Sequence, residues 1–109
     1  MSVSKSSSMS EHELQQRILL ELGNHPEMRV WRNNSGALYD QRGHLIKFGL
    51  QGSADILGII KPHGRFLAIE VKAPRGKLTE QQERFKQMIE GHGGLYILAR
   101  TLEDVKNIT

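Results

Sequence analysis

The stretch GSADILGIIKPHGRFLAIEVKA, residues 52–73, contains two apolar runs separated by the tetrapeptide KPHG. Pro and Gly mark a tight turn, so the runs Ala54–Ile60 and Arg65–Ala73 are predicted to form a β-hairpin. Both runs are apolar at successive positions, which is typical of strands that are covered on both faces. The hairpin is therefore expected at the centre of a sheet with helices on either side.

Three charged residues interrupt these apolar runs: Asp55 in the first, and Glu70 and Lys72 in the second. If the turn holds an even number of residues, residue 57 opposes residue 68 and Asp55 opposes Glu70 across the ladder. Lys72 lies two residues further on and emerges on the same face. A three-residue loop with a bulge at Gly64 would instead point Glu70 the other way.

Two opposed carboxylates destabilise a sheet, so this pair needs a chemical reason. One remedy is a shared proton on a carboxyl pair with a raised pKa. The other is a divalent cation, which prefers hard oxygen ligands, with Lys72 beside it to hold an anion or orient a water. In the structural alternative, Asp55 caps a strand end, and Glu70 with Lys72 forms an exposed ion pair on an edge strand. The three residues together favour the functional interpretation.

Two helices are predicted outside the hairpin. SEHELQQRILLELGN, residues 10–24, begins with a capping box between Ser10 and Glu13, and TEQQERFKQMIEG, residues 79–91, begins with one between Thr79 and Gln82. The remaining predicted elements are strands at Met28–Asn34 and Gly94–Arg100, a short hairpin around Arg42–Gly43, and a short C-terminal helix over residues 101–107.

This order of elements predicts a small α/β sandwich with a central mixed β-sheet flanked by helices. The crossover through residues 79–91 makes the last strand parallel to its neighbour. A length of 109 residues fits one domain, assigned to residues 10–109. The Ser-rich residues 1–9 are predicted to be a disordered tail.

The composition excludes several classes of function. The chain has no cysteine, which excludes disulfides, zinc–thiolate sites and cysteine nucleophiles, and favours a reducing cytoplasm. No apolar run is long enough for a membrane span or a signal peptide. The formal net charge of +3 favours a polyanionic partner. The five histidines are scattered without metal-site spacing, and Trp31 is predicted to be a core residue.

Asp55 followed by EVK (Glu70-Val71-Lys72) resembles the D…(D/E)-x-K signature of the PD-(D/E)XK nucleases. One branch of that superfamily, the VRR-NUC domain, is similar over a longer range, from about residue 10 to residue 104. Ala54 departs from the wider superfamily, which often has Pro at this permissive position. The resemblance implies a restriction-endonuclease-like α/β sandwich. The similar blocks are VWRNNSGA (Val30–Ala37), FGLQGSADILGI (Phe48–Ile59) and FLAIEVKAPRGKLTEQQERF (Phe66–Phe85).

The resemblance also implies a metal-dependent reaction. Asp55 and Glu70 would be metal ligands, with the main-chain carbonyl of Val71 as a third. Mg²⁺ is the expected ion, and Mn²⁺ is expected to substitute for it. Lys72 would orient the water that attacks a phosphodiester, giving products with 5′-phosphate and 3′-hydroxyl ends.

Two further positions have both a structural and a functional interpretation. Gln82 completes a capping box, and it also matches the glutamine that buttresses the active site in the family; neighbouring Gln81 is the weaker candidate. Glu11 lies on the apolar face of the first helix and is assigned as a tentative metal ligand. Glu13 is explained by its capping box, although a shift in where the helix starts would exchange the roles of Glu11 and Glu13.

Five residues near the predicted site are assigned as DNA contacts: Arg32, Asn33, Ser53, Arg75 and Lys77. Arginine pairs well with phosphate, and basic loop residues make binding salt-dependent. The structural alternative is ordinary loop chemistry, in which the polar residues brace the site and the charges are solvated.

The resemblance implies a divalent-metal-dependent, structure-selective DNA endonuclease, similar to Holliday-junction resolvases. Two symmetric cuts in branched DNA imply a homodimer, and the expected location is the cytoplasm of a bacterium or a phage-infected host cell. One alternative is a nuclease that prefers flaps, nicks or single strands, or a restriction-type enzyme. Another is a non-catalytic DNA-binding module.

Overall fold

The computed structural model describes residues 9–108 of the chain, so the predicted tail, residues 1–9, lies outside the described residues except for Met9. None of the helices in this range is long and apolar enough to cross a lipid bilayer. The elements in chain order are α1 (Glu11–Gly23), β1 (Met28–Arg32), β2 (Gly36–Tyr39), β3 (Leu45–Phe48), β4 (Ile56–Ile60), β5 (Arg65–Val71), α2 (Glu80–Gly91), β6 (Leu95–Ala99) and the 3₁₀ helix η2 (Leu102–Val105).

Both α-helices begin at the predicted capping boxes. The Oγ of Ser10 accepts a hydrogen bond from the amide of Glu13, whose carboxylate accepts one from the amide of Ser10, both at 3.0 Å. Thr79 and Gln82 make the same reciprocal pair at the start of α2. These bonds satisfy amide groups that the first helical turn leaves without partners.

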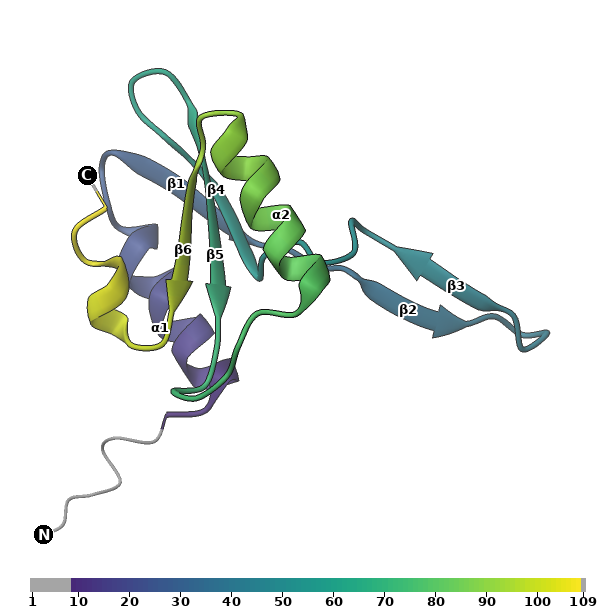
Figure 1. Ribbon diagram of the computed structural model, residues 1–109. Coiled ribbons are helices and arrows are strands. Elements are labelled where there is room, and N and C mark those ends of the chain that lie inside the picture. Colours follow the sequence, from purple (N-terminus) through teal and green to yellow (C-terminus); the bar gives the residue numbers. More distant parts are fainter. Residues whose placement is uncertain (1–8, 109) are drawn as a thin grey trace, which may run out of the picture.

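Four strands form the central sheet, in the order β1-β4-β5-β6. The pairs β1–β4 and β4–β5 are antiparallel, and β5–β6 is parallel because α2 carries the chain back across the sheet. Figure 1 shows α1 and η2 on one side of this sheet and α2 on the other. The predicted mixed sheet between helices, with a parallel last strand, is confirmed.

The alternation of side chains along the strands divides the core into two layers. On the α1 side, Leu14, Ile18 and Leu22 pack against strand residues that include Leu67 and Ile69. On the α2 side, Phe85 and Ile89 pack with Ala68 and Tyr96, and the rings of Phe85 and Tyr96 meet edge to face at 6.3 Å. Glu70 lies two residues after Ala68 on β5 and therefore belongs to the α2 side.

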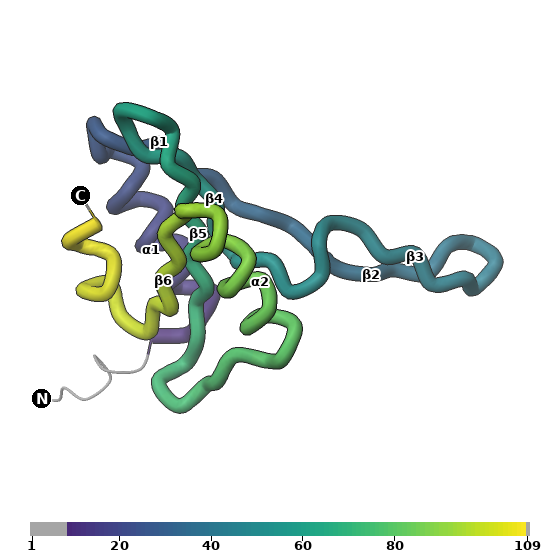
Figure 2. The backbone as a smooth tube through the Cα atoms, turned by 45° about the horizontal axis from the view of Figure 1, so that its top comes forward, coloured from purple at the N-terminus to yellow at the C-terminus, as the bar shows by residue number. Residues whose placement is uncertain are grey.

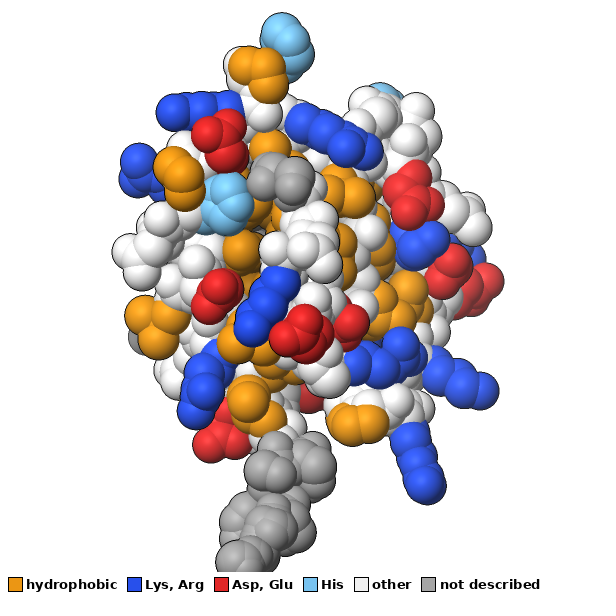
Figure 3. Space-filling view, turned by 90° about the vertical axis from the view of Figure 1, so that its left-hand side faces the viewer, with side chains coloured by type: hydrophobic (Ala, Val, Ile, Leu, Met, Phe, Trp, Pro, Cys, Tyr) orange, Lys and Arg blue, Asp and Glu red, His pale blue; other side chains and the backbone are white. Residues whose placement is uncertain are grey.

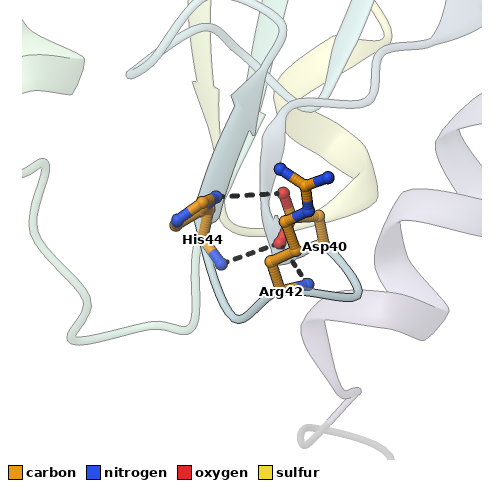
Figure 4. Close-up of polar contacts among 3 residues, drawn as sticks. All are labelled: Asp40, Arg42 and His44. Carbon is orange, nitrogen blue, oxygen red and sulfur yellow. Dashed lines mark hydrogen bonds and ion pairs between the residues drawn. The ribbon is translucent and has the colours of Figure 1, made fainter.

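The second sheet is a two-stranded hairpin of β2 and β3, which we call the arm (residues 36–48). It confirms the hairpin predicted around Arg42–Gly43. Figures 1 and 2 show it extending away from the rest of the domain. Its tip is ordered by Asp40, whose Oδ1 accepts hydrogen bonds from the amides of Arg42 and His44, both at 2.8 Å (Figure 4).

The prediction that Trp31 belongs to the core is wrong. Its side chain is 43% exposed, because α2 covers β5 and β6 and leaves the same face of the edge strand β1 open. Its neighbours Met28 and Val30 point to the α1 side and are better covered. The strands are also shorter than predicted: β1 ends at Arg32, β4 starts at Ile56 and β5 ends at Val71.

Candidate active site

The site is built where β4 begins and β5 ends, on the α2 side of the sheet. Ile56 pairs with Ile69, and the ladder continues through Leu57 with Ala68, so the predicted even-numbered turn is confirmed. Asp55 directly precedes β4 and lies opposite Glu70 by continuation of this register. One oxygen of Asp55, Oδ2, accepts a hydrogen bond of 2.8 Å from the amide of Val71, which fixes the carboxylate beside β5.

Glu70 is buried, with 4% of its surface exposed. Burial, followed by the charge of Asp55, raises the pKa of Glu70 from its usual 4.5 to about 8. Burial also raises the pKa of Asp55, while the hydrogen bond from the Val71 amide opposes that rise. Without a cation, the pair therefore favours a proton on Glu70 and the charge on Asp55.

Lys72 is half-buried, and it lies two residues after Glu70, on the same side of the sheet. Its ammonium charge lowers the pKa of both Asp55 and Glu70, so it lies close enough to act on the pair electrostatically. Its amide donates to the carbonyl of Ala99 at 3.0 Å, which extends the parallel ladder with β6. The three residues singled out from the hairpin are thus brought together.

Gln82 fills both roles that the sequence leaves open. Its Oε1 accepts from the amide of Thr79 at 2.9 Å, and its Nε2 donates to Oε2 of Glu70 at 3.1 Å. The capping box fixes the side chain in the orientation that reaches Glu70. Gln81 is exposed on the helix surface.

The side chains of Glu11 and Glu13 have different hydrogen-bond partners, which distinguishes their roles. Glu13 is held in its capping box, whereas Oε2 of Glu11 accepts a hydrogen bond of 2.9 Å from the amide of Ala73. The charge of Glu11 contributes to the raised pKa of Asp55 and of Glu70. However, no three His, Cys, Asp or Glu side chains in residues 9–108 cluster closely enough to hold a metal ion.

Asn33 and Ser53, predicted as DNA contacts, are bonded to one another. The side-chain amide of Asn33 donates to Oγ of Ser53 at 2.7 Å and to the carbonyl of Ala54 at 2.9 Å. The main-chain amide of Asn33 donates to the carbonyl of Asp55 at 2.8 Å. Three hydrogen bonds from one residue therefore hold the segment that carries Asp55.

The three predicted basic contacts are all exposed: Arg32 at the end of β1, and Arg75 and Lys77 in the loop between β5 and α2. This loop is held by a residue that sequence reasoning missed. Arg100 follows β6, and its guanidinium donates to the carbonyl of Gly76 at 2.7 Å. Its place at the end of a strand parallel to β5 was the available signal, since the ends of parallel neighbours meet at one sheet edge.

Tyr96 was also missed. Its hydroxyl is buried and has no hydrogen-bond partner among the described residues. Burial, followed by the charges of Glu70 and Asp55, raises the pKa of this phenol above its usual value. The phenol therefore stays neutral next to the carboxyl pair.

The donor set fits a small divalent cation. Mg²⁺ is usually held by one or two carboxylates and keeps several waters, so Asp55 and Glu70 suffice without a third side chain. Oε1 of Glu70 is buried and has no hydrogen-bond partner within the described residues. A buried acceptor without a donor is costly unless a cation or water occupies it.

A family model described as the VRR-NUC domain matches residues 9–102, which is nearly the whole chain. The match includes every residue assigned to the site. A comparison with curated proteins gives no match.

Proposed function

Because this chain belongs to the VRR-NUC domain family and is a nuclease-type domain, we propose that it is a divalent-metal-dependent DNA endonuclease that selects branched DNA. The observation that supports this most strongly is the opposed pair of half-buried Asp55 and buried Glu70, with the cation Lys72 beside it. Such a constellation suits phosphodiester hydrolysis, in which negative charge develops on the phosphate in the transition state.

Each residue has a defined task in this proposal. Asp55, Glu70 and the main-chain carbonyl of Val71 would hold Mg²⁺, or Mn²⁺ in its place. When bound, such an ion supplies a Lewis acid for the phosphate and makes a nearby water more acidic. Lys72 orients the attacking water and neutralises charge on the phosphate. Gln82 fixes one oxygen of Glu70 and leaves the other free.

The bond changes are those of a hydrolysis. The water oxygen forms a bond to phosphorus, the bond from phosphorus to the 3′ oxygen breaks, and the electron pair leaves with that oxygen. The water loses a proton to solvent, and the leaving oxygen takes one up. The products are a 5′-phosphate and a 3′-hydroxyl.

The DNA would follow the exposed basic side chains around the carboxyl pair. Arg32 is the last residue of β1, where it pairs with Ile56 next to Asp55, and Arg75 and Lys77 lie in the loop after β5. These three are our candidates for phosphate contacts, whereas Asn33 and Ser53 contribute by bracing Asp55. Affinity should consequently fall as the salt concentration rises.

A cleavage assay tests the proposal. The protein is incubated with four-way junctions, flaps, nicked duplex, single strands and intact duplex, in Mg²⁺, in Mn²⁺ and in a chelator. We expect metal-dependent cutting of the branched substrates, with a loss of at least about 100-fold in Lys72→Ala and unchanged DNA binding. Cutting that persists undiminished in Lys72→Ala would contradict the mechanism, and binding without any cutting would indicate a DNA-binding module.

Symmetric cutting of a junction needs two sites, so we infer that the working form is a homodimer. A preference for flaps or nicks in the same assay would contradict this inference and leave the nuclease chemistry intact. The two conclusions are thus tested separately.

A further inference from the structure

Arg100 lies next to Lys72 where the parallel strands β5 and β6 end. Their register pairs Val71 with Ala99, and its continuation places Lys72 beside Arg100. Paired residues of neighbouring strands point to the same face, so both side chains lie on the α2 side of the sheet. Figure 1 shows the two strands ending at the same edge, from which the loop to α2 departs.

Arg100 is half-buried and forms no ion pair with a carboxylate among the described residues, and the same holds for Lys72. The Nε of Arg100 is buried and has no hydrogen-bond partner in residues 9–108. On the face shown in Figure 3, by comparison, acidic and basic side chains are interspersed. An unpaired buried donor on a charged group costs stability, and such departures are expected at functional sites.

The guanidinium of Arg100 is bonded to the loop between β5 and α2. Its Nη2 donates to the carbonyl of Gly76 at 2.7 Å, which is a charge-assisted hydrogen bond. The amide of Gly76 donates to the carbonyl of Ala73 at 2.9 Å, and the amide of Ala73 donates to Glu11 on α1. The turn at the start of this loop is therefore held at both ends, by α1 at Ala73 and by Arg100 at Gly76.

Gly76 lies against the aliphatic part of the Lys72 side chain. A Cβ at position 76 would lie 3.3 Å from Cδ of Lys72 and 3.4 Å from its Cβ. The main chain of the loop thus forms a wall along the lysine stem. Because that stem is long and flexible, its ammonium group has a fixed position only where packing restricts the rotamers.

We propose that Arg100 is a positioning residue for the reaction: through Gly76 it holds the loop against the stem of Lys72 and so fixes the ammonium group that orients the attacking water. This rests on the proposed function, in which Lys72 has that task. The same bond fixes the loop between Arg75 and Lys77, our candidates for phosphate contacts. Precise placement matters because an error of about 1 Å can cost about 100-fold in rate.

The geometry favours this role over a direct contact of Arg100 with a phosphate. Its Nη2 is directed to the carbonyl of Gly76, and its Nε is buried. The Nε–Nη2 edge, one of the edges with which arginine grips a phosphate through a pair of donors, is therefore turned toward the protein.

The rate of single-turnover cutting at saturating DNA and Mg²⁺ tests the proposal. Arg100→Met removes the donor and keeps a long side chain, so we expect the rate to fall about 10- to 100-fold. Arg65→Met is the matched control, because Nε of Arg65 donates to the carbonyl of Gly93 at 2.9 Å at the opposite end of β5. Its rate should equal that of the wild type. An unchanged rate in Arg100→Met would overturn the proposal.

A double-mutant cycle shows whether Arg100 acts through Lys72. In the Lys72→Ala background, Arg100→Met should cause no further loss of rate, because the side chain that it positions is absent. A second loss of the same size would assign Arg100 to the phosphate and overturn the proposal.

Gly76→Val is a second variant if Arg100→Met fails to fold. Its side chain would crowd the stem of Lys72, whereas the main-chain carbonyl that Arg100 binds is retained. We expect the rate to fall in this variant as well, and a wild-type rate would contradict the packing on which the proposal depends.

Limited proteolysis tests the hold on the loop without metal or DNA. Arg75 and Lys77 are exposed, and trypsin cuts after both types of residue. In Arg100→Met, cutting at these two sites should be about 10-fold faster relative to cutting after Arg42 in the arm, as expected when one charge-assisted hydrogen bond is lost. An equal acceleration at all three sites would indicate general loosening and overturn the proposal.

Competitive acetylation, read by mass spectrometry, tests the position of Lys72 in the same metal-free protein. Arg100→Met should label Lys72 faster relative to the exposed Lys47. A wild type that cuts no DNA, together with this change, would refute the nuclease and leave Arg100 as the residue that positions Lys72. An active enzyme in which neither proteolysis nor labelling changes would refute the positioning alone.

Discussion

The Nε2 of Gln82 donates a hydrogen bond of 3.1 Å to Oε2 of Glu70, and the same side chain closes the capping box of α2 through its Oε1. A helix start and a candidate metal ligand therefore share one residue. This connection links the position of α2 to the geometry of the site, because Glu70 cannot be displaced without loss of that bond.

Gln82→Ala should lower the affinity for the metal ion more than it lowers the stability of the fold. Groups that orient metal ligands typically contribute a factor of about 10 to 100 in metal affinity, so we expect the Mg²⁺ concentration for half-maximal cutting to rise by that factor. Thr79→Ala is the control, because it removes the capping bond without touching Glu70 and should lower stability by about 1 kcal/mol. An equal rise in both variants would contradict a direct role for Gln82.

The stability of the metal-free protein should fall as the pH rises from about 5 to 8. The pKa of Glu70 is about 8 in the folded chain and near 4.5 when unfolded, so over this range the folded state binds the extra proton. Stability from this group is greatest below its unfolded pKa and is lost toward its folded pKa. Urea unfolding in chelator measures it.

In Glu70→Gln the same titration should be flatter, since the side chain no longer ionises. Added Mg²⁺ should stabilise the wild type at pH 8 and leave this variant unchanged. A wild-type stability that is constant between pH 5 and pH 8 would show that Glu70 is not protonated in the folded chain.

Asn33→Ala separates bracing from DNA contact. Loss of its two side-chain bonds leaves Oγ of Ser53 and the carbonyl of Ala54 without a donor, which should lower stability by about 1–3 kcal/mol. Because Asp55 is then held less firmly, kcat should fall while KM for DNA changes little. Asn34→Ala, at the exposed neighbouring position, is the control. A raised KM at unchanged kcat would assign Asn33 to DNA instead.

Gly52→Ala should disturb the segment that precedes Asp55. Gly52 has a φ of +83°, and a Cβ there would lie 2.6 Å from the carbonyl oxygen of Gln81 in the first turn of α2. We expect a loss of about 2–3 kcal/mol, from strain together with this contact. Gly43→Ala has the same strain at φ +82° but open space around it. Equal melting temperatures for the two variants would contradict the close approach.

Local patterns predicted the elements correctly because each depends on residues near in sequence. The capping boxes need residues three apart, and the hairpin register needs only the parity of the turn at Lys61–Gly64. Even the opposition of Asp55 and Glu70 is a consequence of that parity, which explains why it was predictable once the turn was assumed to be even.

Where local pattern was insufficient, a contact between distant parts of the chain decided the outcome. Trp31 is a large apolar residue of a type expected in a core, but its burial depended on which strands α2 covers. The bond of Arg100 to Gly76 depended on the parallel docking of β6 beside β5. The spacing of apolar residues along the sequence specifies neither the strands that a helix covers nor the order of the strands in the sheet.

The sequence by itself determined the secondary structure, the mixed sheet and the three charged residues of the central hairpin, because hydrophobic period and turn chemistry act over a few residues. Only the tertiary structure decided that Gln82 reaches Glu70, that Asn33 braces Asp55, and that the arm extends from the domain with an uncovered apolar face. These depend on packing between segments far apart in the chain, whose relative positions no local pattern specifies.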